Sequence, residues 1–439
     1  MSIAIAIVGS GPAGFYAAEA IIKARPDAQV DLFDRLPTPY GLVRSGVAPD
    51  HQGTKNVWRV FQRTAQRPQV RFLGNVELGR DIHLHEMRAA YDAVVLAIGA
   101  PIDRELGVPG EHQRGVLGSG PFTSWYNGHP DWSGFEPDLD SSHIAIIGNG
   151  NVAVDVARVL ARTPPEMVKT DLPGYASSKI ARAPLTDIYM IGRRGPGEAS
   201  FTPVELRELG DLDRCVAVVD PAHLPESVTA KDPKDQKLKD KILEILRGYS
   251  QNDPASKPVR LHIVFYSAPQ EVLGDGDKVT GLRLARTKVE GGRAITTGET
   301  YDVPVGVIIK AIGFYCRPIE GLPMPERSTC YPNVDGHIDG NLWAVGWAKR
   351  GPSGVIATNR ADSISVVERL LKTLPEGTES KADARAHVDA LLRERSVRVV
   401  SFADWEKIEA REHATAQEGA PRVKITEWQH LLECAHQDS

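Results

Sequence analysis

Continuous runs of apolar residues, many of them β-branched, predict strands that are buried on both faces of parallel sheets. Residues 3–8 (IAIAIV) form the first such run. A glycine-rich turn, GSGPAG, follows it, and FYAAEAIIKA then places its apolar residues at helical spacing. The next strand is predicted at residues 28–34 (AQVDLFD). This order of strand, helix and strand predicts a βαβ unit.

A second unit begins at residues 142–161, where SHIAIIGNGNVAVDVARVLA predicts a strand, a glycine turn and a helix. The stretch 163–186 is rich in Pro, Ala, Ser and Thr, and we interpret it as an insertion that is partly helical at best. The chain then returns through an apolar strand that ends at Ile191. Two further apolar strands, 93–100 and 305–314, carry a glycine near their ends. Each is expected to close one unit and lead to the other domain.

Two segments lie outside this repeated pattern. Residues 231–258 predict a charged helix followed by a polar loop. The last ~65 residues predict amphipathic helices with a proline-flanked strand or turn. Their pattern alone indicates no function.

Length and composition fit a globular protein of two domains, with room for an appendage. The chain has 439 residues, of which 41% are hydrophobic and 25% charged. Its 52 basic and 57 acidic side chains give a net charge of −5, which argues against a general nucleic-acid binder but leaves room for a local basic patch.

The cysteines and the apolar runs indicate where the protein is expected to reside and which kinds of site it is expected to lack. Cys215, Cys316, Cys330 and Cys434 form no CxxC pair, so we expect no disulfide framework, no redox dithiol and no metal or iron–sulfur site. Such cysteine usage favours a reducing compartment. No basic signal-peptide segment precedes the first strand, and no apolar run approaches the ~18–20 residues of a membrane span. The sequence therefore predicts a cytoplasmic protein without a transmembrane segment.

The first glycine turn predicts a dinucleotide site. Gly9, Gly11 and Gly14 have the GxGxxG spacing between a strand and a helix, which lets a pyrophosphate approach the backbone and the positive end of the helix. Asp34 ends the following strand, where a carboxylate can accept hydrogen bonds from a ribose 2′-hydroxyl. The alternative is a turn that only joins strand to helix. The N-terminal position and the terminal acid favour FAD.

The second glycine turn, GNGNVA at residues 148–153, has an alanine in the third glycine's place. Its returning strand leads into Gly192, Arg193 and Arg194 instead of an acid. Guanidinium groups match the geometry of a 2′-phosphate, which an acid at this place would repel. The arginines therefore predict NADP(H), and the alternative is a solvated or ion-paired couple on a loop.

Several motifs resemble the adrenodoxin reductase family of ferredoxin–NADP⁺ reductases over essentially the whole chain. They are IVGSGPAGFYAA, TPYGLVRSGVAPDH, IIGNGNVAVDVAR, IGRRGP, FTPVELREL and GWAKRGPSGVIATN, and their order also agrees. The resemblance implies an α/β fold of two Rossmann-like domains, glutathione-reductase-like, with mostly parallel sheets. It implies an FAD-binding domain formed by residues 1–101 and 318–439, with a C-terminal helical extension, and an NADP-binding domain at 102–317.

The same resemblance implies the site residues. For FAD these are Gly9, Gly11, Ala13, Gly14, Asp34, Leu42, Val76, Trp347, Gly354, Val355 and Ile356. For NADP they are Asn149, Gly150, Asn151, Val152, Arg193, Arg194, Glu205 and Gly354. Independently of the resemblance, the segment that begins with KRGPSGVIATN predicts a glycine turn that opens a helix. Its N-terminus suits the electron-rich edge of a reduced flavin, and an ordinary capped helix is the alternative.

His51 and Glu205 are the residues that we predict to take part in the chemistry. Hydride transfer needs positioning more than a nucleophile, so Glu205 is expected to orient the nicotinamide or its ribose. His51 is expected to relay a proton to or from the flavin, and a solvent-facing histidine in the polar PDHQGTKN loop is the alternative.

The expected reaction passes a hydride from NADPH to FAD and then single electrons to a small, acidic iron–sulfur ferredoxin. The basic side chains of the charged helix are a candidate docking surface for that transient partner: Lys234, Lys237, Lys239, Lys241 and Arg247. A solvated helix is the alternative, since acids are interleaved with these cations: Asp232, Asp235, Asp240 and Glu244.

Other functions are possible on the same kind of fold. A disulfide reductase needs a dithiol, and the glutamate synthase β-subunit carries an N-terminal cysteine-rich segment; neither feature occurs here. Another NADPH-dependent flavoprotein, such as a diaphorase or monooxygenase, remains an alternative. So does a non-catalytic flavoprotein that senses NADP.

Overall fold

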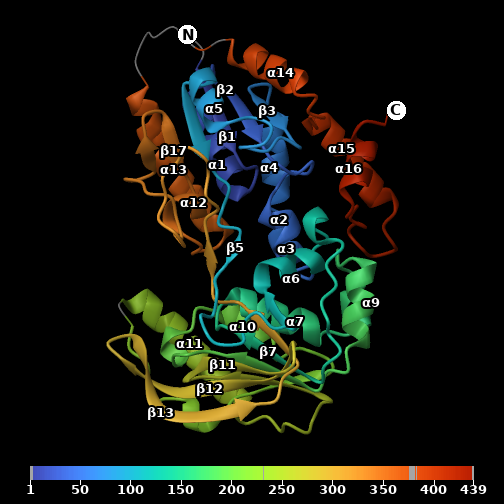
Figure 1. Cartoon of the computed structure of the whole chain (residues 1–439), viewed down its shortest axis with the longest axis vertical. Coiled ribbons are helices and arrows are strands. Elements are labelled where there is room, and N and C mark those ends of the chain that lie inside the picture. Colours follow the sequence, from blue (N-terminus) through green and yellow to red (C-terminus); the bar gives the residue numbers. More distant parts are fainter. Residues whose placement is uncertain (1–2, 231, 375–380, 382, 438–439) are drawn as a thin grey trace.

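Two six-stranded sheets, one above the other along the long axis of the molecule, organise the chain (Figure 1). The computed structural model describes residues 3–230, 232–374, 381 and 383–437. We call the two halves the upper and the lower unit, as they stand in Figure 1. None of the helices in the described residues combines the length and the apolar character that crossing a bilayer requires.

The upper sheet has the order β16-β17-β4-β1-β2-β3, and only β16 pairs in the antiparallel sense. Its strands are β1 Ala4–Val8, β2 Gln29–Phe33, β3 Val70–Leu73, β4 Ala93–Leu96, β16 His337–Asp339 and β17 Leu342–Ala344. One face packs on α1 Pro12–Ala24, α4 Trp58–Ala65 and α13 Ile356–Thr373. The other face packs on α5 Leu84–Ala90 and α14 Ala384–Glu394. Burial on both faces accounts for the apolar run at 3–8.

The lower sheet has the order β6-β14-β7-β8-β10-β9, and every pair in it is parallel. Its strands are β6 Val116–Gly118, β7 His143–Ile147, β8 Asp187–Ile191, β9 Cys215–Val218, β10 Val259–Val264 and β14 Val307–Lys310. One face packs on helices, chiefly α6 Ser119–Tyr126, α7 Asn151–Ala161, α9 Gly174–Arg182, α10 Pro203–Glu208 and α11 Pro233–Tyr249. The predicted α/β fold of two Rossmann-like units with mostly parallel sheets is confirmed.

An antiparallel sheet that the sequence did not predict covers the other face of the lower sheet. It consists of β11 Ser267–Asp275, β12 Lys278–Glu290 and β13 Arg293–Val303. Most of β13 is exposed, so its sequence lacks the apolar signal of a buried strand. The stretch 163–186 is also more regular than predicted, since it contains α8 Pro164–Met167 and α9.

Two short strands form the connection between the units. β5 Ile102–Asp103 and β15 Phe314–Tyr315 pair in the antiparallel sense, so the chain enters and leaves the lower unit through one narrow ribbon (Figure 1). The predicted domain boundaries at 101/102 and 317/318 lie close to the ends of this ribbon, and they stay a prediction.

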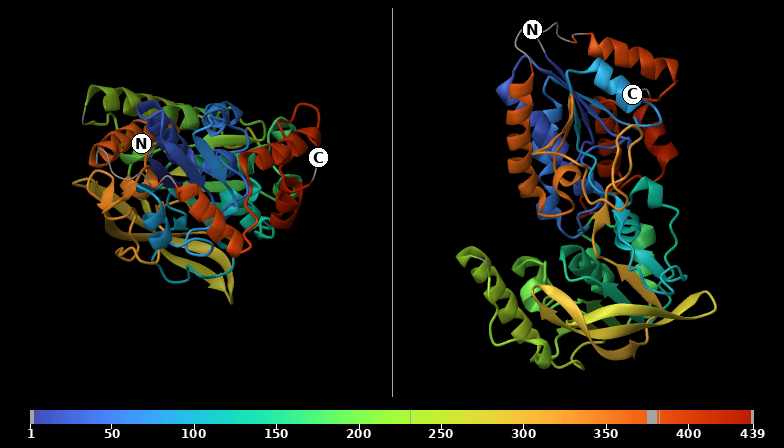
Figure 2. Two further views of the ribbon diagram at one scale, coloured as in Figure 1. Left: turned by 90° about the horizontal axis from the view of Figure 1, so that it is seen from above. Right: turned by 60° about the vertical axis from the view of Figure 1, so that its left-hand side comes forward.

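The other short helices connect the main elements, and the last helices form the C-terminal segment. The short ones are α2 Leu42–Ser45, α3 Gln52–Lys55, α12 Trp347–Arg350 and the 3₁₀ turns η1 Pro130–Trp132, η2 Pro196–Glu198 and η3 Pro221–His223. The C-terminal helices α14, α15 Phe402–Ala414 and α16 Trp428–Ala435 are amphipathic, as predicted. They run along the upper unit toward the lower one, as Figures 1 and 2 show.

Candidate functional site

Both glycine turns lie at the point in their sheet where the strand order reverses. In the upper sheet β1 stands between β2 and β4, and in the lower sheet β7 stands between β8 and β14. Nucleotides bind outside the carboxyl ends of parallel strands at such a point. The topology therefore places one candidate nucleotide site at the end of β1 and a second at the end of β7.

Glycine is required at the first position of each turn. Gly9 has φ of +107°, and a Cβ atom on it would lie 2.5 Å from the carbonyl oxygen of Ala97, which follows β4. Gly148 has φ of +138°, and its Cβ would lie 2.2 Å from the carbonyl oxygen of Ala311, which follows β14. The two turns therefore have the same construction, in which the glycine presses against the chain that leaves the neighbouring strand.

Each turn leads directly into the start of a helix. Gly11 is the N-cap of α1 and Gly150 is the N-cap of α7, and no side chain of the described residues caps either helix. Gly41 approaches Gly11 so closely that a Cβ on Gly41 would lie 2.9 Å from its Cα. Bare N–H groups at a helix N-terminus beside glycine backbone fit a pyrophosphate. Both turns thus suit a dinucleotide.

Asp34 lies beside the first turn. Its Oδ2 accepts hydrogen bonds from the backbone N–H and the hydroxyl of Ser10, at 2.9 and 2.6 Å, and its Oδ1 accepts from the N–H of Leu36 at 2.9 Å. Burial raises the pKa of Asp34, and these hydrogen bonds oppose the rise. A carboxylate oxygen has more than one lone pair, so this orientation still lets Asp34 accept a hydrogen bond from a ribose hydroxyl.

The strand register refines the comparison of Asp34 with the arginines. Val8 pairs with Phe33 in the upper sheet, and Ile147 pairs with Ile191 in the lower sheet. Gly192 therefore takes the place equivalent to Asp34, and Arg193 and Arg194 follow it.

The second residue of each turn explains why an acid can stand at position 34 and only a glycine at position 192. A Cβ on Gly192 would lie 1.9 Å from Nδ2 of Asn149, whereas the smaller Ser10 leaves room for Asp34. Oδ1 of Asn149 is buried without a hydrogen-bond partner in the described residues. Such an orphaned acceptor at the phosphate turn is consistent with a bound group that donates to it.

Arg193 is exposed and Arg194 is half-buried, and neither forms an ion pair with any described residue. Their backbone is fixed, because the hydroxyl of Thr287 donates to the carbonyl of Arg193 at 2.7 Å and the N–H of Tyr266 donates to the carbonyl of Arg194 at 3.2 Å. Two guanidinium groups without acidic partners at this place fit a 2′-phosphate.

The predicted flavin residues of the C-terminal half gather around the start of α13. The segment from Ser353 to Val355 is exposed, and Val355 at the N-cap offers no side-chain acceptor to the first turn. A Cβ on Gly346, the N-cap of α12, would lie 2.6 Å from the Cβ of Ala13. Ser363 of α13 donates to the carbonyl of Ala13 at 3.0 Å, so α1 contacts both helices. Trp347 donates its indole N–H to the carbonyl of Ser353 at 3.1 Å. Leu42 is 49% exposed and Val355 54%, so both side chains are accessible to a bound ring.

Val76 is part of the upper unit but is almost fully buried, and its N–H donates to the carbonyl of Asp34 at 2.9 Å. The structure therefore brings Val76 to the end of β2, while its contact with a cofactor stays a prediction.

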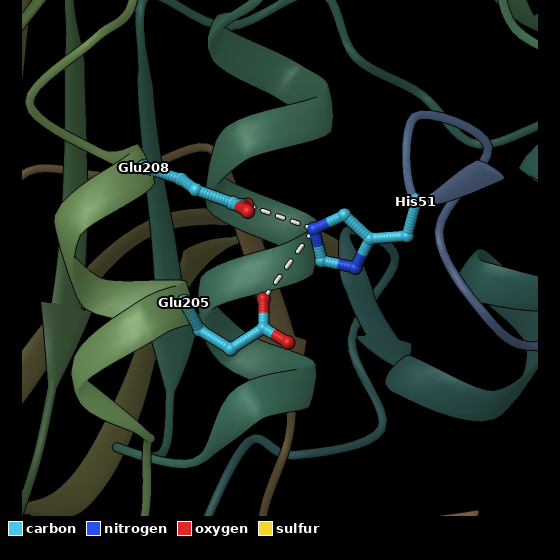
Figure 3. A group of neighbouring side chains, drawn as sticks. All are labelled: His51, Glu205 and Glu208. Atoms are coloured by element: carbon cyan, nitrogen blue, oxygen red, sulfur yellow. Dashed lines mark hydrogen bonds and ion pairs between the residues drawn. The ribbon is translucent and has the colours of Figure 1, made fainter. Parts of the chain in front are cut away.

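His51 and Glu205 come from different units and meet at the junction (Figure 3). Nε2 of His51 lies 3.5 Å from Oε2 of Glu205 and forms a hydrogen bond of 2.8 Å with Oε2 of Glu208. On its other side, Nδ1 lies 3.8 Å from Oδ1 of Asp155. The sequence singled out His51 and Glu205 without predicting a contact between them, and it missed Glu208, which is the closer partner of His51.

Arg158 stands at the centre of these acids, and its side chain is fully buried. It forms ion pairs with Asp50 at 2.6 Å and Asp155 at 2.8 Å, and with Glu208 at 3.2 Å and Glu205 at 3.4 Å. Asp50 comes from the upper unit and the other three acids from the lower unit. The guanidinium therefore joins the two units directly beside His51.

Burial and the neighbouring charges shift the pKa values of His51, Glu205 and Glu208 in different directions. Burial lowers the pKa of His51, but the hydrogen bond to Glu208 and the charges of Asp155 and Glu205 raise it, and the net direction is upward. Burial and the charge of Asp155 raise the pKa of Glu205. Burial also acts to raise the pKa of Glu208, but the hydrogen bond from His51 and the charge of Arg158 bring it below its ordinary value. The cluster can therefore hold a proton on His51 and hand it to a neighbouring acceptor.

A signal for the missed residues was present in the sequence. Asp155 and Arg158 occupy one face of a helix that is otherwise apolar, and Asp50 directly precedes His51. Charged side chains on a buried helix face indicate a paired cluster. The pattern could not show that Glu208 is the partner of His51.

Known proteins of similar sequence cover the whole chain. The NADPH-ferredoxin reductase FprA of Mycobacterium tuberculosis is 40% identical over 98% of this chain and 98% of its own length. The mitochondrial NADPH:adrenodoxin oxidoreductase of Arabidopsis thaliana is 41% identical over 98% of this chain and 95% of its own length. The chain belongs to the family of NADPH–ferredoxin and NADPH:adrenodoxin reductases.

The fold agrees with this family. The structure of Mycobacterium tuberculosis FprA in complex with NADPH matches with a TM-score of 0.94 and 39% sequence identity, over 99% of this chain and 100% of the other. A family model described as pyridine nucleotide-disulphide oxidoreductase matches residues 3–168. Cys215, Cys316, Cys330 and Cys434 are free cysteines in the structure.

The first prediction concerns the two arginines. The double substitution of Arg193 and Arg194 by Ala removes the cations that fit a 2′-phosphate. It should raise the KM for NADPH by about a hundredfold or more, since each of the two charge-assisted contacts contributes at least about 1.5 kcal/mol. The KM for NADH should change by less than about twofold, because NADH has no such phosphate. Steady-state kinetics with both nucleotides measure this, and equal changes would contradict the assignment.

The second prediction concerns His51 and Glu208. Glu208→Gln removes the negative charge of the acceptor and leaves a weaker, neutral hydrogen bond to His51, so the titration of the His51 ring should move to lower pH. Nuclear magnetic resonance of ¹⁵N-histidine-labelled protein measures it, with His51→Gln to assign the signal and Glu244→Gln on the exposed face of α11 as the control. His51→Gln should also slow reduction of the bound flavin by about tenfold to hundredfold. An unmoved titration together with an unchanged rate would refute this role.

Proposed function

We propose that the chain is an FAD-containing ferredoxin–NADP⁺ reductase that passes electrons between NADPH and a small iron–sulfur ferredoxin. One observation carries the proposal. Two copies of one nucleotide-binding turn differ in the residues after the returning strand, which are an acid in the upper unit and two unpaired arginines in the lower. Membership in the reductase family supports the same assignment.

The residues of the chain bind and orient the two nucleotides. FAD supplies the step that converts a hydride from NADPH into single electrons for an iron–sulfur partner. In the upper unit we assign to FAD the residues Gly9, Gly11, Ala13, Gly14, Asp34, Leu42, Val76, Trp347, Gly354, Val355 and Ile356. In the lower unit we assign to NADP(H) the residues Asn149, Gly150, Asn151, Val152, Arg193, Arg194 and Glu205, with Gly354 facing it from the upper unit. The units are residues 1–101 with 318–439, and 102–317.

His51 and Glu205 act where the two assigned sites meet. Glu205 orients the reacting end of NADP(H), and His51, held by Glu208 and Asp155, holds or moves a proton at its ring nitrogen. Because Arg158 forms ion pairs with Asp50 of the upper unit and Asp155 of the lower unit, it holds these side chains at a fixed distance from one another. Positioning of this kind is the main contribution that a protein makes to hydride transfer between two bound cofactors.

The acidic ferredoxin is proposed to dock near α11. Lys234, Lys237 and Lys241 are exposed there without an ion pair to any described residue. Lys239 pairs with Asp235 within the helix, and Arg247 donates to the carbonyls of Pro225 and Glu226. In Figure 1 and in the right view of Figure 2, α11 lies on the same side of the molecule as α12 and α13. A cytoplasmic location is part of the proposal, on the ground of the four unpaired cysteines.

The third prediction tests the function itself. An anaerobic stopped-flow experiment measures the rate at which a reduced nucleotide reduces the bound flavin in a single turnover. NADPH should reduce the flavin rapidly, and NADH should do so much more slowly at the same concentration. A small iron–sulfur ferredoxin should then reoxidise the flavin in one-electron steps. A flavin that NADPH reduces slowly or not at all would indicate a non-catalytic sensor. Reoxidation by oxygen with insertion into a substrate would indicate a monooxygenase.

The fourth prediction tests the docking surface. Lys237→Glu combined with Lys241→Glu should raise the KM for ferredoxin by about tenfold at low salt and leave flavin reduction by NADPH unchanged, because long-range charge acts on the encounter. High salt should reduce the difference between the variant and the parent protein. Lys169→Glu with Lys372→Glu is the matched control, because both lysines are exposed, lie outside α11 and have no ion pair with any described residue. An unchanged KM for ferredoxin would mean that α11 is an ordinary solvated helix.

A further inference from the structure

A buried ion triad joins three distant parts of the chain: Lys55 of α3, Asp171 of the lower unit and Lys424 of the C-terminal segment. Nζ of Lys55 lies 2.8 Å from both carboxylate oxygens of Asp171, and Nζ of Lys424 lies 2.8 Å from its Oδ2. The three side chains are 6%, 4% and 1% exposed. Burial acts to raise the pKa of Asp171, but Lys424 and Lys55 outweigh it and hold that pKa well below its ordinary range.

Lys424 contacts both units at once. Besides Asp171, its ammonium donates to the carbonyl of Arg44 at 2.9 Å and to the carbonyl of Asn127 at 2.8 Å. Arg44 lies in the upper unit, and Asn127 follows α6 of the lower unit. Burial lowers the pKa of Lys424, and the charge of Asp171 opposes this. A protonated Lys424 has three donors, and Asp171, Arg44 and Asn127 supply one acceptor for each.

The C-terminal segment is itself fixed to the upper unit. Glu412 of α15 is completely buried, forms an ion pair with Arg44, and accepts from Arg422 at 3.3 Å and from the N–H of Ile425 at 2.9 Å. The guanidinium of Arg44 also lies 5.0 Å from the ring centre of Trp405. These contacts fix the loop between α15 and α16, which carries Lys424, to the upper unit. We call the segment from α15 to α16 the arm.

A second contact ties the same arm to the lower unit. The indole N–H of Trp428 donates to Oδ1 of Asp131 at 2.8 Å, and Asp131 also pairs with Arg35 of the upper unit. Figure 1 shows the loop between α15 and α16 reaching down to the lower unit beside α9.

Moving the units apart would leave buried charges without partners. Removing one member of a buried, hydrogen-bonded ion cluster is far more costly than losing a surface pair. The triad therefore favours one relative orientation of the two units. The polypeptide ribbon β5–β15 is narrow, so contacts of this kind, and not the covalent connection, set that orientation.

We propose that Lys424 is a positioning residue for hydride transfer, and that the C-terminal segment acts as an arm that sets the angle between the FAD-binding and NADP-binding units. This inference rests on the proposed function. Lys424 touches neither assigned nucleotide site; it acts by fixing the lower unit, through Asp171 and Asn127, against the upper one. An error of about 1 Å in the meeting of the two reacting atoms can reduce a rate by about a hundredfold.

The fifth prediction tests the arm with Lys424→Met, which leaves Asp171 paired with Lys55. The variant should keep its FAD and bind 2′,5′-ADP, which occupies only the lower unit, with a Kd within about twofold of the parent protein. Its single-turnover rate of flavin reduction by NADPH should fall by about tenfold or more. Small-angle X-ray scattering should show a larger radius of gyration, which reports the loosened angle independently of activity. Arg411→Met on the exposed side of α15 is the matched control and should match the parent protein.

The outcomes separate the arm from the proposed function. If Lys424→Met folds and keeps the parent protein's rate of flavin reduction and radius of gyration, the proposal that the C-terminal segment sets the angle between the units is wrong. If that variant does not fold, Trp428→Phe decides, because it removes one hydrogen bond to Asp131 and should slow flavin reduction by up to about fivefold with an unchanged Kd for 2′,5′-ADP. An unchanged rate in Trp428→Phe then overturns the proposal. If NADPH does not reduce the parent protein, the proposed function is wrong. The radius of gyration of Lys424→Met, compared with that of the parent protein, then still tests whether the C-terminal segment sets the angle between the units.

Discussion

The arrangement of this protein depends on one buried guanidinium. Arg158 is fully buried between the units and pairs with Asp50 above it and with Asp155, Glu205 and Glu208 below it. A buried arginine needs such partners, because an unpaired charge at this place would be very costly. With these partners, Arg158 resists separation of the units together with the Lys55–Asp171–Lys424 triad. The same pairing places His51 between Glu205, Glu208 and Asp155.

The two nucleotide sites are variations on one construction. Gly9 and Gly148 press against the chain that leaves the neighbouring strand in the same manner, and each leads to an uncapped helix. The difference begins at the next residue. Ser10 leaves room for Asp34 and binds it, whereas Asn149 occupies the space of a side chain at position 192, so that glycine stands there and the arginines come after it. In the proposed assignment, the preference for a bare or a phosphorylated ribose follows from this small change at the phosphate turn.

Much of this could be predicted from the sequence because it is local. A buried strand, a glycine turn and a helix follow one another within about twenty residues, and the acid or the arginines end the next strand. The partner of His51 could not be predicted, since Glu208 lies 157 residues away and only the folded chain brings them together. The same holds for Lys424, whose pattern in a short polar loop gives no sign of burial. The antiparallel sheet was missed because β13 is exposed and carries no apolar signal.

We infer that the buried ions hold the two units in a fixed orientation, so that the reacting atoms meet without a slow closing movement. The most direct test is the rate at which the bound flavin is reduced in one turnover by NADPH that carries deuterium at the transferred position. If the units are already aligned, hydride transfer itself limits this rate, and the deuterated nucleotide should react severalfold more slowly than ordinary NADPH. Equal rates for the two nucleotides would mean that a movement of the units limits the reaction, and would contradict the fixed orientation.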